Sequence, residues 1–465
     1  MGETSKRRTG AEFRVARWVV QHPGSLLLPG APSVAVGALG ADAALEVGSW
    51  SAGAAAVGLC GWYRAHPDTF DRYALPVLRA WRRRWVTYMG WRWRNAVLDC
   101  GLTTANRRSG EERFPRILAV RCWSPTIDVL RVKLAPGQSA ATWQDKLPEL
   151  ADCLKAERVG VEKVKPRVIS LIIQRAEPFT EVIPAPEMPQ DVGSVDLGSV
   201  YIGETEFATE FRIGVDREHV FVAGATGAGK NSVILAALRA LAPMIRAGLV
   251  RLWLADPKQS EFAALAPIAY RYSAITEPDD EDGDDPYTIA DLVREFRADM
   301  AATQRHLKAV KDRKITVSRE TPLNLLILDE IGAITAYSDI ARLLRKDLAV
   351  IATQGRATGH RMWGLVQEPS KDVVPIRDLF TCRVCLRVTS AAHVDMVLGE
   401  DARARGALAD EIPNLPETAG IGFVIRPRTR APQRIRAAFT DDHEITELVA
   451  FVLSGNNDSY LKVVA

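Results

Sequence analysis

The chain has almost no net charge, because its 465 residues include 60 Lys and Arg against 57 Asp and Glu, a formal charge of +3. This balance excludes a polycation that binds nucleic acid over its whole surface, so any such surface must be local. The other proportions, 25% charged and 47% hydrophobic residues, are ordinary for a globular protein. The length predicts more than one folded unit.

Cysteine is scarce, with six residues scattered along the chain. Their spacing excludes the disulfide framework of a small secreted protein and favours reduced thiols. Only Cys382 and Cys385 form a C-x-x-C motif, in an alternating run that is typical of a strand. Because no second pair and no His partner accompanies them, we interpret these two cysteines as structural and not as a zinc or redox site.

Charge is nearly absent from two stretches near the N-terminus, 25–41 and 47–63, which are rich in Gly, Ala, Leu and Val. Each has 17 residues, the lower limit for crossing a hydrocarbon core. Basic residues flank the pair on both sides, so the positive-inside rule favours a transmembrane helical hairpin with both ends in the cytoplasm. The alternatives are a buried helical pair, given Pro29 and Pro32, and a secretory signal that ends near residue 43.

A segment rich in Trp and Arg, 81–94, follows the second stretch. It suits the interface of an anionic membrane or, equally, an exposed helix with a Trp-lined packing face. We therefore expect residues 1–100 to form a membrane anchor.

The rest of the chain has the periodicities of an α/β protein. Strands are predicted at 117–122, 129–134 and 168–173, and an amphipathic helix at 140–154. Beyond a Pro/Gly-rich stretch, short apolar strands alternate with helices, which is typical of a mostly parallel sheet. The expected units are a small α/β domain (110–185), a linker (186–203), a larger α/β domain (204–440) and a C-terminal tail (441–465).

A Walker A loop is predicted between the strand-like segment 219–223 and a following helix. The sequence G-A-T-G-A-G-K-N-S lies there, and its small residues let backbone N–H groups wrap phosphates at a helix N-terminus. Lys230 is expected to reach the β- and γ-phosphates of ATP. The expected nucleotide-binding residues are Gly224, Ala225, Thr226, Gly227, Ala228, Gly229, Lys230, Asn231 and Ser232.

The usual hydroxyl directly after the Walker A lysine is missing, since Asn231 occupies that position and a hydroxyl returns only at Ser232. That hydroxyl normally binds Mg²⁺. Either the Asn231 carbonyl oxygen or Ser232 is expected to ligate the metal, and the alternative is a weakened site.

A second, buried strand ends in the acid pair Asp329 and Glu330. We expect Asp329 to hold Mg²⁺ and Glu330 to polarise the attacking water, because paired acids at this place serve hydrolysis and not binding alone. Gln367, at the end of a further strand, is placed to sense the γ-phosphate. The sequence thus predicts an ATPase that uses ATP and Mg²⁺.

Further motifs follow in order: Asp256-Pro-Lys258 after a strand, G-R-A-T-G at 355–359 leading to Gln367-x-Pro369, and R-V-C-L-R-V-T-S at 383–390. With the P-loop and the acid pair, they make the chain similar to the FtsK/SpoIIIE family of DNA translocases. It particularly resembles the shorter membrane-anchored transfer proteins of actinobacterial conjugative plasmids and integrative elements.

This resemblance implies a RecA-like P-loop ATPase motor that forms a ring, usually a homo-hexamer, with double-stranded DNA in its channel and ATP between subunits. It also implies a cell-membrane location with the motor in the cytoplasm. A neighbouring subunit must supply a positive group, for which Arg356 and Arg383 are the candidates. Lys258 is expected to tie the site to the subunit interface.

Several points limit the resemblance. The short stretch after Phe439 leaves no room for the winged-helix reader of many family motors, so slight sequence preference is expected, and an accessory DNA-loading protein is a possible partner. The acidic run 277–285 is interpreted as a solvated loop. The alternative function is a type VII secretion-like ATPase that moves proteins, although such proteins usually carry several motor domains and this sequence has a single P-loop.

Overall fold

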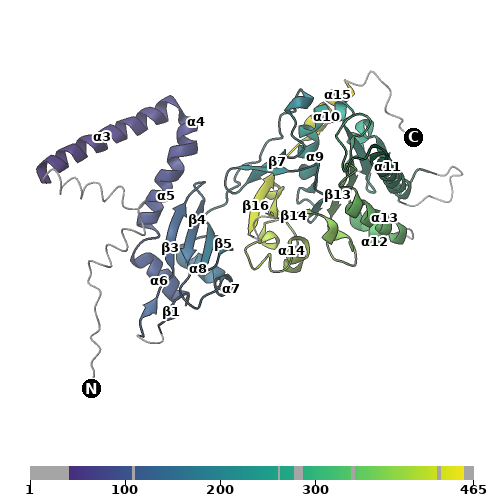
Figure 1. Cartoon of the computed structure of the whole chain (residues 1–465). Coiled ribbons are helices and arrows are strands. Elements are labelled where there is room, and N and C mark those ends of the chain that lie inside the picture. Colours follow the sequence, from purple (N-terminus) through teal and green to yellow (C-terminus); the bar gives the residue numbers. More distant parts are fainter. Residues whose placement is uncertain are drawn as a thin grey trace.

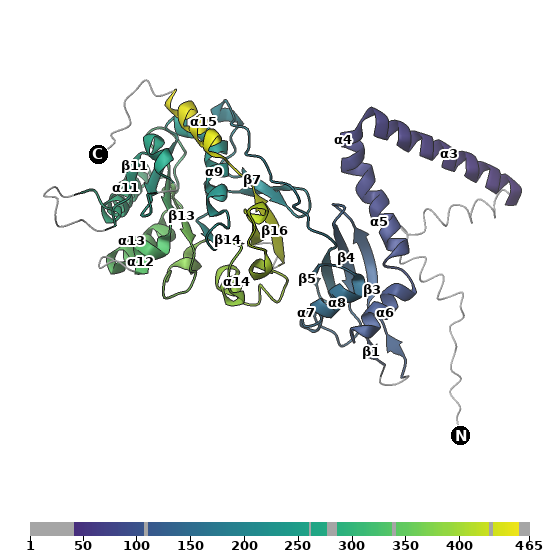
Figure 2. The same cartoon turned by 180° about the vertical axis from the view of Figure 1, so that it is seen from behind.

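The computed structural model describes residues 41–106, 110–259, 262–276, 286–336, 341–426 and 431–454. Helices at the N-terminal side, a small domain and a larger domain follow one another along the chain (Figure 1). The view from behind again shows the small domain between the other two parts (Figure 2). The expected acidic loop 277–285 and residues 25–40 of the first expected transmembrane stretch lie outside the described residues.

The N-terminal part is helical, and its longest helix projects away from the small domain (Figure 1). It consists of α3 (Ala41–Ala65), α4 (Pro67–Thr69), the π-helix η1 (Phe70–Ala74), α5 (Leu75–Val86) and α6 (Trp91–Asp99). The second expected transmembrane stretch, 47–63, lies within α3. In the part of the chain that the structure describes, no helix combines the length and the apolarity needed to cross a membrane. Gly and Ser residues of α3, such as Ser51 and Gly53, add little to its apolarity, and the predicted hairpin is not supported.

The small domain is built on an antiparallel four-stranded sheet in the order β3-β4-β6-β5. Its strands are β3 (Arg116–Arg121), β4 (Ile127–Lys133), β5 (Arg158–Lys165) and β6 (Val168–Gln174), while β1 (Thr104–Ala105) and β2 (Glu112–Arg113) pair separately. The helices α7 (Ala140–Gln144) and α8 (Leu147–Leu154) pack with α6 on the sheet. Every residue of β6 is buried, because one face of this inner strand packs under the helices and Ile172, on the other face, packs with Ala431 of the larger domain.

The small domain differs from expectation in three places. The single helix expected at 140–154 is two helices, because Pro148 lacks a backbone N–H and begins a new one. Strand β5 was not expected. Residues of α6 that were expected in the N-terminal anchor, among them Trp93 and Val97, belong instead to the core of the small domain, where they pack with Trp143.

The larger domain contains a ten-stranded sheet in the order β11-β10-β12-β13-β9-β14-β15-β16-β7-β8. The strands β11, β10, β12, β13, β9 and β14 are parallel to one another. Each of the remaining strands, β15, β16, β7 and β8, is antiparallel to its neighbours. They are β7 (Val200–Thr205), β8 (Glu210–Ile213), β9 (Val220–Ala223), β10 (Val250–Ala255), β11 (Arg271–Ser273), β12 (Leu323–Leu328), β13 (His360–Val366), β14 (Cys382–Leu386), β15 (Ile421–Ile425) and β16 (Pro432–Ala437). The mixed α/β architecture with a largely parallel sheet is therefore confirmed.

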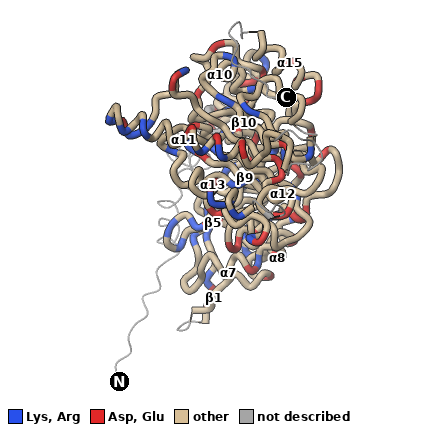
Figure 3. Tube along the Cα trace, turned by 90° about the vertical axis from the view of Figure 1, so that its right-hand side faces the viewer, with Lys and Arg blue, Asp and Glu red and all other residues tan. Residues whose placement is uncertain are grey.

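Two apolar cores lie on the two faces of this sheet. One contains residues of α9 (Lys230–Ala240), α10 (Ala242–Arg246) and α15 (Asp442–Leu453), and the other contains residues of α11 (Ile289–Val310), α12 (Ile331–Ala336), α13 (Ala341–Gln354) and α14 (Ala391–Leu398). Short 3-10 helices complete the domain: η2 (Val192–Ser194), η3 (Ala263–Ile268), η4 (Arg377–Leu379), η5 (Ala409–Glu411) and η6 (Pro416–Thr418). Acidic and basic residues are interspersed along the trace (Figure 3).

Two elements occupy stretches for which no regular structure was expected. The last part of the expected linker, 186–203, forms most of β7, and residues 442–453 of the expected tail form α15. This helix belongs to the domain because Leu448 and Val452 are buried in its core, and because Arg239 donates to the Glu444 carbonyl oxygen over 2.7 Å.

A buried ion pair joins the small domain to the larger one. The Arg158 guanidinium, on β5, lies 2.6 Å from Glu206 Oε2, directly after β7. Arg158 also donates to the carbonyl oxygen of Gly406 over 2.6 Å and lies over the ring of Phe423. With the pair almost completely buried, the two domains are fixed to each other at this point.

Candidate nucleotide-binding and hydrolysis site

The predicted Walker A loop lies at the carboxyl end of β9, directly before α9. Gly227 and Gly229 have φ values of +74° and +83°. A residue with a Cβ atom is strained in this conformation, whereas glycine adopts it freely. A Cβ added to Gly229 would also lie 2.4 Å from the backbone nitrogen of Gly420. The loop therefore requires glycine at these positions for its curvature and for its close packing on the turn before β15.

Lys230 opens α9 and turns its side chain back along the loop, where Nζ donates to the Gly224 carbonyl oxygen over 3.0 Å. Of the two candidate metal ligands that follow, Asn231 is partly exposed and Ser232 is buried in the first turn of α9. The lysine thus lies inside the curve of backbone N–H groups that the sequence predicts for phosphate binding.

Asp329 follows β12 and lies beside Asp256, which follows the neighbouring strand β10. Burial and the Asp256 carboxylate raise the pKa of Asp329 from its usual value of 3.8 to about 6. Asp329 Oδ2 and Asp256 Oδ1 are both buried with no hydrogen-bond partner among the described residues. Two adjacent carboxylates with orphaned oxygens are the arrangement that a divalent cation relieves, so these residues fit Mg²⁺.

The described residues contain no group of three or more His, Cys, Asp or Glu side chains arranged to hold a metal ion. A Mg²⁺ ion bound with ATP needs no such group, because phosphate and water oxygens complete its coordination. The cysteines Cys382 and Cys385 are buried in β14, as their structural interpretation requires.

Glu330 has a left-handed backbone, with φ of +47°, which is uncommon for a residue other than glycine. Its carboxylate is held on two sides: Lys258 Nζ lies 3.2 Å from Oε2, and the backbone N–H of Gln367 donates to Oε1 over 3.1 Å. The strained backbone and these contacts fix the direction of the carboxylate at the end of the sheet.

Gln367 connects the acid to the Walker A loop. Its backbone contacts Glu330, while its side-chain Oε1 accepts a hydrogen bond from Thr226 Oγ1 over 3.3 Å. A single residue therefore connects Thr226 of the loop with Glu330.

Arg387 is a site residue that the sequence analysis did not single out. It follows β14, the strand beside β9, and its guanidinium donates to the carbonyl oxygen of Thr226 over 2.6 Å. Its side chain is almost completely buried. The sequence signal that could have identified Arg387 was its position at the end of the strand-like run that contains Arg383.

The two candidate trans-acting arginines lie away from this chain's own Walker A loop. Arg356 is exposed in the turn before β13, and Arg383 lies near the start of β14, where it pairs with Asp378 over 3.6 Å. Because β13 and β14 run parallel to β9, their starts lie at the sheet edge opposite the loop. The structure therefore brings Lys230, Asp329, Glu330 and Gln367 together and leaves the two arginines out.

Comparison with known proteins places this site in a family context. Residues 187–406 match the FtsK/SpoIIIE family. The DNA translocase FtsK of Halalkalibacterium halodurans is 25% identical over 295 residues, which are 60% of this chain and 35% of the relative. The DNA translocase FtsK of Mycobacterium leprae is 25% identical over 348 residues, 70% of this chain and 39% of the relative. The chain thus spans little more than a third of the length of these relatives.

Among solved structures, the pCW3 conjugation coupling protein TcpA, determined with ATPγS, is 18% identical. The match has a TM-score of 0.48 and covers 78% of this chain and 98% of that one. The cytoplasmic domain of the type VII secretion ATPase EccC of Thermomonospora curvata is 18% identical, with a TM-score of 0.42 and coverage of 60% and 33%.

Proposed function

We propose that the chain, whose residues 187–406 match the FtsK/SpoIIIE family, hydrolyses ATP to move double-stranded DNA. The observation that carries the proposal is the placement of Glu330, whose carboxylate is held by Lys258 and by Gln367, while Gln367 also contacts the Walker A loop. An ATP-binding protein without turnover needs no such arrangement. A motor needs this arrangement, because loss of the γ-phosphate must change the conformation of residues outside the nucleotide site.

Each residue at the site has a separate task in this proposal. Lys230 and the backbone N–H groups of the loop hold the phosphates, and Glu330 accepts a proton from the attacking water. Gln367 transmits the presence or loss of the γ-phosphate to β13, the strand that it follows. Lys258 holds the Glu330 carboxylate in its direction until the substrate is in place.

Asp329 and Ser232 are the residues that would hold Mg²⁺, with Asn231 as the second candidate for the position next to α9. A bound Mg²⁺ neutralises charge on the β- and γ-phosphates. The raised pKa and the orphaned oxygen of Asp329 support its assignment.

The active assembly in this proposal is a ring, most simply a homo-hexamer with DNA in the channel. Arg356 and Arg383 lie at the sheet edge opposite the Walker A loop, a position that suits action on a neighbouring subunit's nucleotide. The biological setting is conjugative transfer of a plasmid or integrative element, or chromosome segregation, at the cell membrane with the ATPase domain in the cytoplasm. An accessory protein would load the DNA.

ATPase assays on the full chain test the proposal. Duplex DNA should stimulate hydrolysis, whatever its sequence, because the contacts are made to phosphates. Raising the salt concentration should abolish the stimulation before it abolishes basal turnover, because counterions released on binding oppose association.

Lys230→Ala provides the control, since it removes the phosphate contact and should show neither activity. An absence of stimulation by duplex DNA across low salt would contradict the DNA motor. A response to unfolded polypeptide alone would assign the chain to the alternative, a protein-secretion ATPase.

A further inference from the structure

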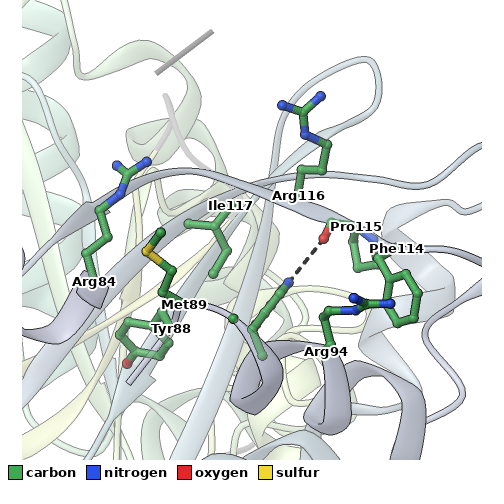
Figure 4. A pocket seen from close by; sticks show the side chains of 10 residues that line it. Arg84, Tyr88, Met89, Arg94, Phe114, Pro115, Arg116 and Ile117 are labelled. Carbon is green, nitrogen blue, oxygen red and sulfur yellow. Dashed lines mark hydrogen bonds between the residues drawn. The ribbon is translucent and has the colours of Figure 1, made fainter. Parts of the chain in front are cut away.

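A pocket of about 260 Å³ lies where the N-terminal helices join the small domain. It is bounded by the end of α5, the turn after it, the start of α6, and β3 with the two residues before it (Figure 4). Its lining combines aromatic and arginine side chains and includes Arg84, Tyr88, Trp93, Arg94, Phe114 and Arg116. It lies in a different domain from the Walker A loop and shares no residue with it.

The floor of the pocket is apolar and rigidly held. Trp93 is buried, stacks on Trp143 with ring centroids 6.3 Å apart, and donates Nε1–H to the carbonyl oxygen of Pro115 over 3.1 Å. Tyr88 is buried and donates to the Asp128 carboxylate over 2.5 Å. Since the polar atoms of both rings are already bonded to protein, only their apolar surfaces face a ligand.

Arginines surround this floor, and they differ in their partners. Arg83 is bound to Asp128 over 2.7 Å, whereas Arg84, the next residue, forms no ion pair with any carboxylate of the described chain. Burial lowers the pKa of Arg84, a cost that a bound anion would offset. The Arg94 guanidinium lies 4.5 Å from the centre of the Phe114 ring. Figure 4 shows Arg84 and Arg116 extending to the same side of the pocket.

The surface around the pocket is both cationic and apolar. Residues 75–98 contain six Arg and four Trp and no Asp or Glu. Several large apolar side chains of this segment are exposed, among them Val86 at 57%, Trp81 at 46% and Trp91 at 68%. Arginine beside exposed tryptophan matches the boundary between anionic headgroups and acyl chains, where both side chains are stable.

We propose that this pocket binds the phosphate headgroup of an anionic phospholipid, with the guanidinium groups of Arg84, Arg94 and Arg116 around the phosphate and the aromatic floor against the lipid's glycerol and first acyl carbons. The backbone of duplex DNA also supplies a phosphate, but it has no apolar part that would cover Trp81, Trp91 and the floor of the pocket. A lipid is therefore the better match. The site is independent of DNA translocation and would dock the small domain on a membrane surface.

Calorimetric titration of the full chain in a non-ionic detergent tests the proposal with soluble probes. Dihexanoylphosphatidylglycerol should bind at least about tenfold more tightly than dihexanoylphosphatidylcholine, because only the first carries net negative charge. The variant Arg84→Gln/Arg94→Gln/Arg116→Gln should lose at least about tenfold in affinity for phosphatidylglycerol. The matched variant Arg305→Gln/Lys308→Gln/Arg313→Gln, which removes three exposed positive charges from the ATPase domain, should bind as the parent does.

Equal binding of the two lipids, or unchanged binding by the pocket variant, would overturn the proposal. Glycerol 3-phosphate that binds as tightly as the lipid would assign the pocket to free phosphate compounds instead. If duplex DNA displaces phosphatidylglycerol, and if the pocket variant binds duplex DNA more weakly than the parent does, the pocket is assigned to nucleic acid. Basal ATP hydrolysis by each variant shows that it is folded, and the single variant Arg84→Gln repeats the test with a smaller change.

Discussion

The Lys258 ammonium group lies 3.2 Å from the carboxylate of Glu330. The two residues follow β10 and β12, which are adjacent in the sheet, and Gln367, which donates to the same carboxylate, follows the next strand, β13. Glu330 is therefore directed by groups from both neighbouring strand ends. Gln367 also accepts a hydrogen bond from Thr226, so a single residue separates the acid from the Walker A loop.

Glu330→Gln should bind ATP with nearly unchanged affinity and lose turnover by about 10²–10⁴-fold, because the amide keeps the hydrogen bond from Gln367 and cannot accept a proton. Nucleotide binding and steady-state hydrolysis measured on the same preparation check this. Turnover equal to that of the parent would remove Glu330 from its proposed role.

The metal ligand next to α9 is open to a paired test. If Ser232 binds Mg²⁺, Ser232→Ala should raise the Mg²⁺ concentration needed for half-maximal hydrolysis, and Asn231→Gly should leave it nearly unchanged. We expect this result, and the reverse pattern would assign the metal to Asn231. Titration of Mg²⁺ at saturating ATP is the measurement.

Asp329→Asn should stabilise the metal-free chain above about pH 6. The pKa of Asp329 is raised in the folded chain, so between its usual value of 3.8 and about 6 the folded state holds a proton that the unfolded state has released. The unfolding free energy therefore falls as pH rises through this window, and the variant should gain roughly 1–2 kcal/mol near neutral pH and nothing below about pH 4.

Thermal unfolding in EDTA over a pH series measures this gain, with Glu400→Gln as an exposed control. Mg²⁺ with ATP should reduce the advantage of Asp329→Asn, because the cation compensates the buried charge. An advantage that is independent of pH would contradict the explanation.

Arg387→Ala should raise the KM for ATP by about tenfold with a smaller effect on kcat, because it leaves the Thr226 carbonyl oxygen without its charged donor. Initial rates against ATP concentration measure both constants. Arg383→Ala is the comparison: if Arg383 acts on a neighbouring subunit's nucleotide, it should lower kcat instead. The same KM effect in both variants would mean that Arg387 has no special role at the loop.

The sequence predicts the strand, loop and helix start around Lys230 because these features are contiguous. The segment 224–232 contains its glycines, its lysine and its helix start in one stretch, and Asp329 with Glu330 follows an apolar run that is typical of a buried strand. Arg387 was missed because its contact with Thr226 spans 161 residues and depends on β14 lying beside β9, an order that no local pattern encodes.

Elsewhere the local signals were ambiguous. Strand β5 carries charged residues in its second half, such as Glu162 and Lys163, which are not typical of a sheet interior. The helix α6 alternates Trp and Arg, and only the packing of Trp93 on Trp143 separates a core helix from an interfacial one. The apolar face of α15 has helical spacing, so this helix was predictable in principle.

The Arg158–Glu206 pair has a mechanical consequence. When β5 and β7 begin to separate, the Glu206 carboxylate and the Arg158 guanidinium lose their contact before water can fully solvate either group. A partly opened contact therefore has a higher free energy than a closed or a fully open one. A force that acts on the small domain is passed to the ATPase sheet through this buried pair.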